Sequence, residues 1–418
     1  MKEKIFSCID ANEALAIELE TGLSARPAIS PDSGGEGELD KCVFLEEWLK
    51  AHGIGQLERH DAPDARAKGG VRPNLVATIP GKSDGKRLWI MSHLDVVPPG
   101  EISLWESDPY RVIKKDDGPL GPRLIGRGVE DNQQGLVSSV LAVLALATTG
   151  VTPTHTVKLL FCADEEVGSA YGIGWLMLQQ QHLENRDLFR KDDMVLIPDS
   201  GDPQGSTIEI AEKNIIWAKC TTRGLQAHGS RPDLGVNAHL AGADLALRLH
   251  RGLSAKFNAR DPLFEPDYST FQPTKKEANV PNINTIPGED VFYMDMRILP
   301  RYSNQEVIAE IDRIKAEVEK QYQVQISCAM PQKAESKATA DDAPLIKSLA
   351  EAIRKVYGVE SRPIGIGGGT VAAHLRNTGI PAAVWCRIAE TAHQPNEYAL
   401  IANILGDAKV MALLMTGN

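Results

Sequence analysis

The stretch LWIMSHLDVVP, residues 88–98, carries a histidine and an aspartate at the end of an apolar run. Leu88 to Met91 is typical of a buried strand, and side chains alternate across a strand, so His93 and Asp95 are expected on the same side. Buried charged groups are costly unless they are paired. In open α/β sheets, reactive groups gather beyond the carboxyl ends of the strands. The stretch therefore predicts an α/β sheet with a functional site at this strand end.

The neighbouring sequence extends this α/β pattern. Strands alternate with helices, which predicts a mainly parallel mixed sheet flanked by helices. The predicted helices cover residues 4–24, 38–53 and 134–149, and the predicted strands cover 74–79, 87–91, 157–163 and 194–198.

The pattern changes near residue 214. A β-α-β-β-α-β order follows, which resembles a ferredoxin-like split unit. Its elements are predicted at 215–222, 236–250, 280–285, 290–299, 306–321 and 323–329, and a helix, a strand and a final helix follow at 345–357, 382–386 and 404–415. We therefore expect a discontinuous catalytic domain, residues 1–213 and 330–418, with an inserted ferredoxin-like α+β lid or dimerisation domain at 214–329.

Net charge, apolar runs and cysteine spacing disfavour several classes of function and location. The chain has 418 residues and a formal net charge of −11, which disfavours nucleic acid or an anionic membrane as partner. The N-terminal stretch has no apolar core typical of a signal peptide, and the apolar run 136–147 is too short to cross a bilayer. The six cysteines lie far apart without a C-x-x-C pair, which favours a reducing cytoplasm.

Polar groups that a core would exclude recur at five element ends. They are His93 with Asp95, Asp131 in GRGVEDNQQG, Glu165 with Glu166 in FCADEEVGS, Asp199 in LIPDSG and His393 in ETAHQP. Several carboxylates that converge need cations or protons. Two histidines with three carboxylates suit a pair of divalent ions that share one bridging carboxylate. Zinc is the default for these ligands, and cobalt or manganese suits them too.

Each member has an ordinary interpretation when it is taken alone. A His-x-Asp pair is most often a hydrogen-bonded surface pair, and adjacent glutamates usually form a solvated face. A single aspartate in a Gly-rich stretch is usually turn chemistry, and His393 alone suggests a surface histidine. The ordered set favours the metal site, because each member stands at an element end in a separate part of the chain.

The set resembles the di-zinc amidohydrolase and metallopeptidase family of acetylornithine deacetylase, succinyl-diaminopimelate desuccinylase, aminoacylase and the glutamate carboxypeptidases. The matching stretches appear in the family's order and span most of the chain. They are SHLDVVP, GRGVEDNQQG, ADEEVGS, PDSG, AHGSRP, NTIPGE, GGGT and AHQPNE.

The resemblance implies a role for each position. His93 and Asp199 would bind one metal, Glu166 and His393 the second, and Asp131 would bridge both. Asp95 would orient His93 through a hydrogen bond. Glu165 would be the general base, which takes a proton from water and delivers it to the leaving amine.

Further candidates lie mostly in the predicted inserted domain. His228 matches a family histidine that reaches the partner subunit's active site and stabilises the oxyanion, which implies a homodimer. Asn284 and Arg297 resemble substrate-contacting positions, although Arg297 also fits an ordinary strand-end salt bridge. Gly369 and Thr370, in the run GGGT, offer groups that could hold a substrate carboxylate; by composition alone the run is a flexible turn.

Three departures from the family pattern stand out. Many relatives have Thr-Ser-Asp where this chain has Thr370, Val371 and Ala372. Asp199 stands where the desuccinylase and acetylornithine deacetylase branches usually have Glu, which resembles the carboxypeptidase and dipeptidase branches. The stretch EDNQQG replaces a more common Asp-Met-Lys-Gly pattern.

The expected function is metal-dependent hydrolysis of an amide bond in an N-acyl amino acid or a small peptide, through two divalent metal ions. A dipeptidase or carboxypeptidase, and a hydrolase of a non-peptide C–N bond, remain as alternatives. A catalytically silent binding protein on the same fold would have lost the base or the ligands, and this chain keeps all of them, including Glu165.

Overall fold

The computed structural model describes residues 1–116, 119, 121–182 and 188–417. The chain divides into two compact units. Unit 1 comprises Met1–Ile210, Thr339–Pro363 and His374–Asn418, and unit 2 comprises Ala211–Ala338 with Ile364–Ala373. The assignment of a catalytic domain to 1–213 and 330–418, and of an inserted domain to 214–329, remains a prediction.

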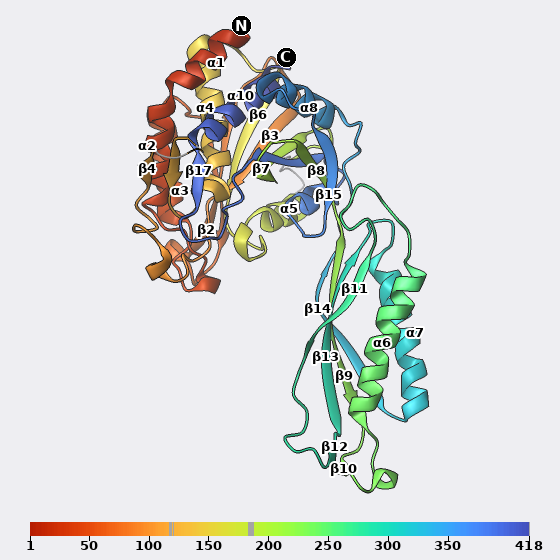
Figure 1. The fold of residues 1–418 in the computed structure, drawn as a ribbon. Coiled ribbons are helices and arrows are strands. Elements are labelled where there is room, and N and C mark those ends of the chain that lie inside the picture. The colour runs from red at the N-terminus through yellow and green to blue at the C-terminus, as the bar shows by residue number, and fades with distance from the viewer. Residues whose placement is uncertain (117–118, 120, 183–187, 418) are drawn as a thin grey trace. The chain divides into compact units, whose positions relative to one another are not determined.

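The larger sheet has eight strands in the order β1-β2-β6-β3-β7-β16-β8-β15 (Figure 1). The four central strands, β6, β3, β7 and β16, run parallel, while β1, β2 and β8 pair antiparallel at the flanks. The α/β class with a large mixed sheet is confirmed, with the parallel part at its centre. The strands are β1 (Leu57–Pro63), β2 (Val71–Ile79), β3 (Ser83–His93), β6 (His155–Cys162), β7 (Met194–Asp202), β8 (Thr207–Glu212), β15 (Arg362–Ile366) and β16 (Ala382–Arg387).

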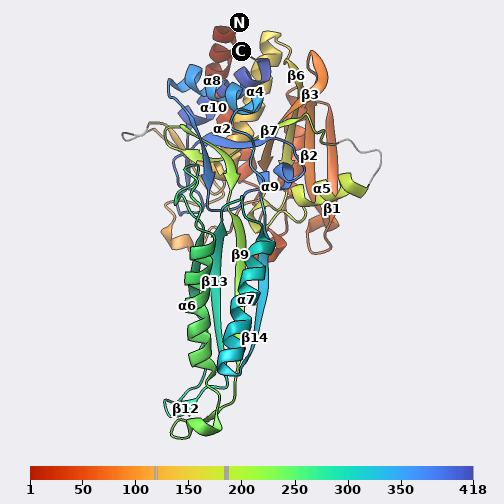
Figure 2. The same ribbon diagram turned by 90° about the vertical axis from the view of Figure 1, so that its right-hand side faces the viewer.

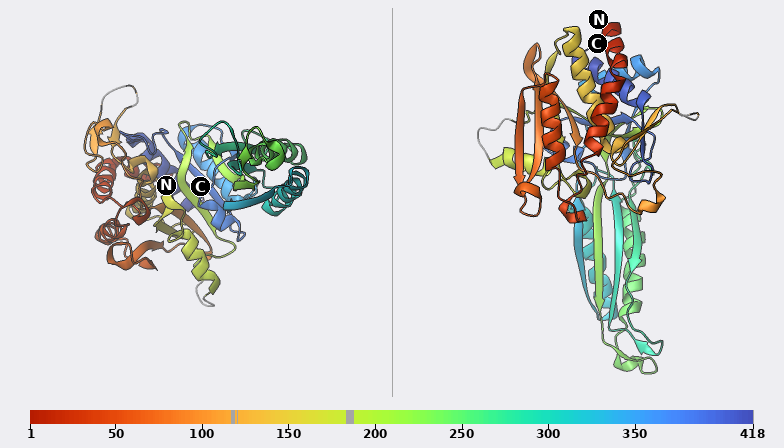
Figure 3. Two further views of the ribbon diagram at one scale, coloured as in Figure 1. Left: turned by 90° about the horizontal axis from the view of Figure 1, so that it is seen from below. Right: turned by 90° about the vertical axis from the view of Figure 1, so that its left-hand side faces the viewer.

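Helices flank this sheet, and a small sheet of order β17-β5-β4 adjoins them. Helix α4 packs against α1, α2 and α10, and the two termini lie close together in the views of Figure 3. Residues 136–146 of α4 are all buried, as expected for a helix that is apolar on every side. The elements are α1 (Lys2–Ala11), α2 (Glu13–Ser24), α3 (Leu39–Ala51), α4 (Gln134–Thr149), α5 (Ile173–His182), α8 (Pro344–Tyr357), α9 (Ala372–Arg376), α10 (Ile401–Thr416), β4 (Ile113–Lys115), β5 (Arg123–Ile125) and β17 (Tyr398–Leu400).

The predicted helix over 4–24 is two helices in the structure. The break falls at Asn12, whose backbone leaves the helical region (φ −98°, ψ 20°). The side-chain amide of Asn12 donates a hydrogen bond to Cys8 Sγ (3.8 Å). Asparagine side chains compete with helical backbone bonds in this way, which makes them frequent at helix ends.

No helix among the described residues combines the length and the apolar composition needed to cross a bilayer.

Unit 2 contains a four-stranded antiparallel sheet of order β11-β13-β9-β14, and α6 and α7 lie against the same face of it (Figure 2). The order β9, α6, β11, β13, α7, β14 follows the predicted β-α-β-β-α-β pattern. The elements are β9 (Asn214–Arg223), α6 (Ala238–Lys256), β11 (Thr270–Lys276), β13 (Glu289–Ile298), α7 (Asn304–Tyr322) and β14 (Gln325–Ala334), with the short ribbon β10 (Ala227–His228) and β12 (Thr285–Ile286).

The predicted strand over 280–285 is wrong. The second strand of the β-α-β-β-α-β pattern is β11, residues 270–276, and of the predicted range only Thr285 belongs to a strand. Strand β11 is an edge strand that contains Pro273 and buries Phe271 alone. Edge strands tolerate proline and polar residues. The apolar pattern of β11 is therefore too weak for the strand to be identified from the sequence.

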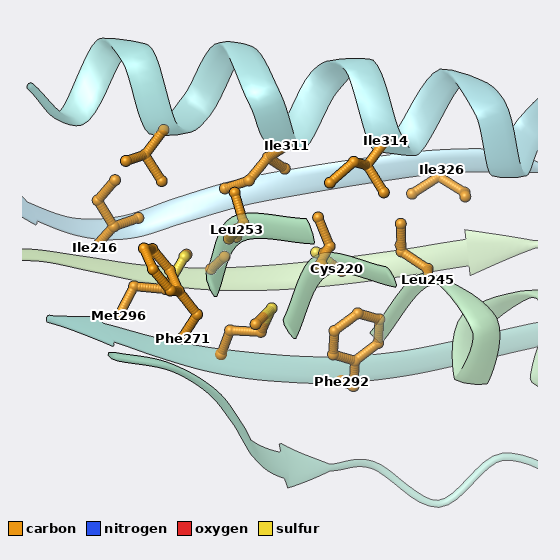
Figure 4. Close-up of a cluster of buried hydrophobic side chains, with 14 of the residues drawn as sticks. Ile216, Cys220, Leu245, Leu253, Phe271, Phe292, Met296, Ile311, Ile314 and Ile326 are labelled. Carbon is orange, nitrogen blue, oxygen red and sulfur yellow. The ribbon is translucent and has the colours of Figure 1, made fainter. Parts of the chain in front are cut away.

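The core of unit 2 lies between its sheet and its two helices (Figure 4). Helix α7 contributes Val307, Ile311, Ile314 and Val318, spaced as one helical face. Strand β13 contributes alternate residues from Phe292 to Ile298, as expected for a sheet with one covered face. The apolar periodicity alone therefore accounts for this packing.

A buried carboxyl group in unit 1 makes stability depend on pH. Asp407 of α10 accepts hydrogen bonds from Tyr357 Oη (2.7 Å), Gln134 Nε2 (3.2 Å) and the Arg387 backbone N–H (3.1 Å). Burial raises the pKa of Asp407 to about 7. The folded state therefore binds this proton more tightly than the unfolded state, so the group's contribution to stability is lost as pH rises from about 4 to about 7.

We expect Asp407→Asn to remove this dependence, because the amide does not ionise, its oxygen can accept from Gln134 and Arg387, and its NH2 group can donate to the Tyr357 hydroxyl. The free energy of unfolding of the variant minus that of the native chain should grow between pH 4 and 7 by about 1.4 kcal/mol per unit of pKa shift. Urea unfolding at several pH values measures this difference. A difference that does not change with pH would contradict the prediction.

Candidate metal centre

Two histidines face one aspartate at the carboxyl ends of the central strands. His93 is the last residue of β3, and Asp131 lies in the irregular helical turn η4 (Val129–Gln133) that leads into α4. Asp131 Oδ1 is 3.0 Å from His93 Nε2, and its Oδ2 is 3.0 Å from His393 Nε2. One carboxylate thus reaches both imidazoles through separate oxygens, which is the arrangement of a bridging ligand.

The two adjacent glutamates lie in the turn after β6, where Asp95 holds their backbone. The carboxylate of Asp95 accepts the backbone N–H groups of Glu165 and Glu166, each at 3.0 Å. Glu166 Oε2 then lies 3.0 Å from His393 Nε2. Asp95 also holds His93, because its backbone oxygen is 2.9 Å from His93 Nδ1. This contact leaves Nε2 of His93 to face the carboxylates.

Asp199, in β7, completes the cluster. Its Oδ1 lies 3.3 Å from His93 Nε2, and within the described part of the chain this buried oxygen accepts no regular hydrogen bond. Buried polar atoms are rarely left without a partner. A buried carboxylate oxygen in this position, beside a histidine and further carboxylates, suits a bound cation.

The charges of the cluster favour positive charge at its centre. Hydrogen bonds to Asp131 and Glu166 raise the pKa of His393 to about 10. Burial alone would raise the pKa of Asp131, but His393 and His93 hold it well below its usual range. Burial, together with the charge of Asp199, raises the pKa of Glu165 well above its usual range. Such opposed shifts are typical of functional sites.

The donor set fits divalent cations. Ligand atoms of His93, Asp131 and Glu166 all lie within 4.8 Å of one another, and so do those of His93, Glu165 and Asp199. Five carboxyl groups therefore meet two imidazoles in one place, a combination typical of zinc and related metals. The structure brings together all seven residues predicted here, namely His93, Asp95, Asp131, Glu165, Glu166, Asp199 and His393.

Comparison with known proteins agrees with this geometry. The model of peptidase family M20/M25/M40 matches residues 89–417. This chain belongs to peptidase family M20/M25/M40. A protein of Methanococcus maripaludis described as an uncharacterized metallohydrolase is 38% identical over 412 residues, covering 94% of this chain and 97% of that protein. This chain is therefore a metallohydrolase.

Other proteins that are similar to this chain are described as enzymes of different activities. A succinyl-diaminopimelate desuccinylase of Gluconacetobacter diazotrophicus is 26% identical over 414 residues, with 96% of each chain covered. The structure of aminopeptidase PepT from Bacillus cereus superposes with a TM-score of 0.73 at 20% identity, covering 97% of this chain and 98% of that one. At that identity the superposition establishes the fold alone.

Sequence reasoning missed residues that hold the metal-centre turns of this M20 chain. Asn132 accepts the backbone N–H of His93 (3.0 Å) and donates to the Pro198 carbonyl (2.7 Å), so it joins the end of β3 to the middle of β7. Glu397 accepts the N–H groups of Glu130 (3.0 Å) and Asp131 (3.1 Å). Asn132 neighbours Asp131 and Glu397 stands in AHQPNE, so position within a motif was the signal that could have identified them.

A second buried group supports the turn with the two glutamates. Asp164, just before Glu165, has a positive φ of 66°. Its N–H donates to Glu38 Oε1 (3.3 Å), and its Oδ1 pairs with Arg72 Nη2 (3.0 Å). Arg72 is fully buried and also binds Glu38. This ion pair holds the backbone from which Glu165 and Glu166 project.

The predicted oxyanion and substrate residues belong to unit 2. His228 and Asn284 are both exposed at the β10-β12 ribbon, where the Asn284 carbonyl accepts the N–H of Gly229 (2.7 Å). His228 Nδ1 accepts the backbone N–H of Ser230 (3.2 Å). With Nδ1 as the acceptor, the ring proton lies on Nε2.

Arg297 and the glycine run are also neighbours in unit 2. Arg297 donates to both carboxylate oxygens of Asp295 (2.8 and 3.0 Å) and to the Gly367 carbonyl (2.9 Å). This is the strand salt bridge that the sequence left open, so a substrate contact by Arg297 remains a prediction. Thr370, beside Gly369, donates to Glu212 Oε1 (2.5 Å).

Proposed function

We propose that this chain hydrolyses an amide bond in an N-acylated amino acid or a small peptide with a free carboxylate. One observation carries the proposal, namely the convergence of five carboxyl groups and two imidazoles with Asp131 between the histidines. In this proposal His93, Asp131 and Asp199 hold one divalent cation, and Asp131, Glu166 and His393 hold a second. When bound, such a pair supplies Lewis acidity and lowers the pKa of water toward neutrality.

Glu165 is the proposed general base. The backbone N–H of Glu165 donates to Asp95, which fixes the position of the residue. The carboxylate of Glu165 lies within 4.8 Å of a carboxylate oxygen of Asp199. Glu165 takes a proton from the attacking water at a carboxylate oxygen and passes it to the nitrogen of the leaving amine. Of two adjacent residues in this turn, one thus binds metal and the other handles the proton.

His228 is the proposed hydrogen-bond donor to the oxyanion. In this proposal it comes from a second copy of the chain in a homodimer. Its exposure supports a role toward another molecule, and its Ser230 contact supports an Nε2 proton that can be donated. Asn284, Gly369, Thr370 and Arg297 are the proposed substrate contacts. The six cysteines are all unpaired, which supports a reducing cytoplasmic setting.

A peptidase is the second candidate, and Asp199 favours it. The desuccinylase branch usually places glutamate at this position, whereas aspartate resembles the dipeptidase and carboxypeptidase branches. Hydrolysis of a non-peptide C–N bond is the third candidate, since the same cluster serves any polarised carbonyl.

A substrate panel with metal-stripped protein tests the proposal. Zinc, cobalt or manganese is added back, and acetyl-, succinyl- and formyl-amino acids are compared with dipeptides and N-carbamoyl amino acids. We expect metal-dependent turnover of at least one amide, and the best substrate identifies the branch. Two bound metals without turnover would exclude these substrate classes, and failure to bind metal would refute the site itself.

A further inference from the structure

A lysine is buried behind the metal centre. Lys41 of α3 is 2% exposed, and no sequence motif identified it. Burial lowers its pKa to about 8, while the charges of Asp95, Glu38, Glu20 and Glu397 oppose that effect. A buried ammonium group is costly unless it has partners. Its position among four carboxyl groups therefore calls for an explanation beyond packing.

The end of this lysine meets Gln133, two residues after Asp131. With the amide oriented so that each atom meets a complementary partner, Gln133 Oε1 accepts from Lys41 Nζ (3.3 Å). The Gln133 amide nitrogen then donates to Glu20 Oε2 (3.0 Å) and Ser24 Oγ (2.9 Å). The Gln133 backbone N–H closes the turn on the Gly128 carbonyl (3.0 Å). Helices α2 and α3 thus both hold the turn that carries Asp131.

We propose that Lys41 is a positioning residue, which holds Gln133 and through it the turn that presents Asp131 between the two histidines. Its positive charge also offsets the carboxyl groups behind the cluster. The proposal rests on the proposed function, because it assigns Asp131 to metal binding.

The proposal predicts that a lysine at position 133 can replace the lysine at position 41. Lys41→Met should weaken zinc binding by about 10–100-fold, as loss of a group that supports a metal ligand does. Gln133→Lys alone should also weaken it, because it brings two ammonium groups together. The double variant Lys41→Met, Gln133→Lys should recover most of the affinity, since one ammonium again occupies the space. Two harmful changes that compensate each other report direct coupling.

Competition for zinc with a coloured chelator measures the affinity of each full-length variant, and thermal unfolding is recorded in parallel. Lys213→Met is the matched control, because Lys213 is also 2% exposed but donates to the carbonyls of Pro266 (2.7 Å) and Tyr268 (2.6 Å). We expect the control to lower the melting temperature and to keep the native zinc affinity.

Native zinc affinity in Lys41→Met would overturn the inference while leaving the proposed function intact. Failure of Gln133→Lys to compensate would overturn it as well. If Lys41→Met does not fold, the double variant decides: recovered folding with near-native affinity supports the role, and an unfolded double variant refutes it. A native chain that binds no zinc would overturn the proposed function and this inference together.

Discussion

Glu165→Gln should lower kcat by about 10²–10⁴-fold, the usual contribution of a general base. Glutamine keeps the shape of the side chain and its turn, because Asp95 holds the backbone N–H and not the carboxylate. Zinc content should stay at the native value, and KM should change little. Steady-state kinetics on the best substrate of the panel, together with metal analysis of the same sample, measures both quantities.

The metal analysis separates two roles for Glu165. Its carboxylate also lies within 4.8 Å of ligand atoms of His93 and Asp199, so it is geometrically able to bind metal. A variant that loses both activity and one metal would make Glu165 a ligand and contradict its role as base. Glu360→Gln, at an exposed position of the α8-β15 connection, is the control and should behave as the native chain.

Asp131→Ala should abolish tight metal binding and reduce activity to background. Asp131 is the carboxylate that reaches both histidines, so its removal takes a ligand from each proposed metal. Loss of groups that merely support ligands costs about 10–100-fold in affinity, and a shared ligand should cost at least as much. The measurement is zinc competition with a chelator, with Asp192→Ala at an exposed loop position as control.

Thermal unfolding offers a second readout for Asp131. Metal at about 100 times its dissociation constant adds about 2.7 kcal/mol of stability, which corresponds to roughly 5 °C in a unit of this size. The native chain should show this gain when zinc is added, and Asp131→Ala should lack it. The metal-free variant should unfold somewhat earlier than the metal-free native chain, because it loses the contacts of Asp131 with His93 and His393, so the zinc-dependent gain is the quantity to compare. A full zinc-dependent gain in the variant would refute the bridging role.

Short-range patterns were sufficient for the elements with strong periodicity. The apolar run 88–91 predicted a buried strand, and β3 is buried from Arg87 to His93. Helix α4 and the helices of unit 2 followed from their apolar spacing. The edge strand β11 and the break at Asn12 escaped because weak or polar segments take their structure from neighbours rather than from their own pattern.

The sequence by itself determined the cluster's members, because His93, Asp131, Glu165, Glu166, Asp199 and His393 each follow a strand or a turn that parallel strands bring to one edge. It also left EDNQQG unexplained. Only the tertiary structure decided what surrounds the cluster. Gln134 binds Asp407 of α10, Gln133 binds Lys41 of α3, and Glu397 holds the N–H of Asp131 from 266 residues away. Such partners are far apart in the chain and carry no spacing rule, so packing alone brings them together.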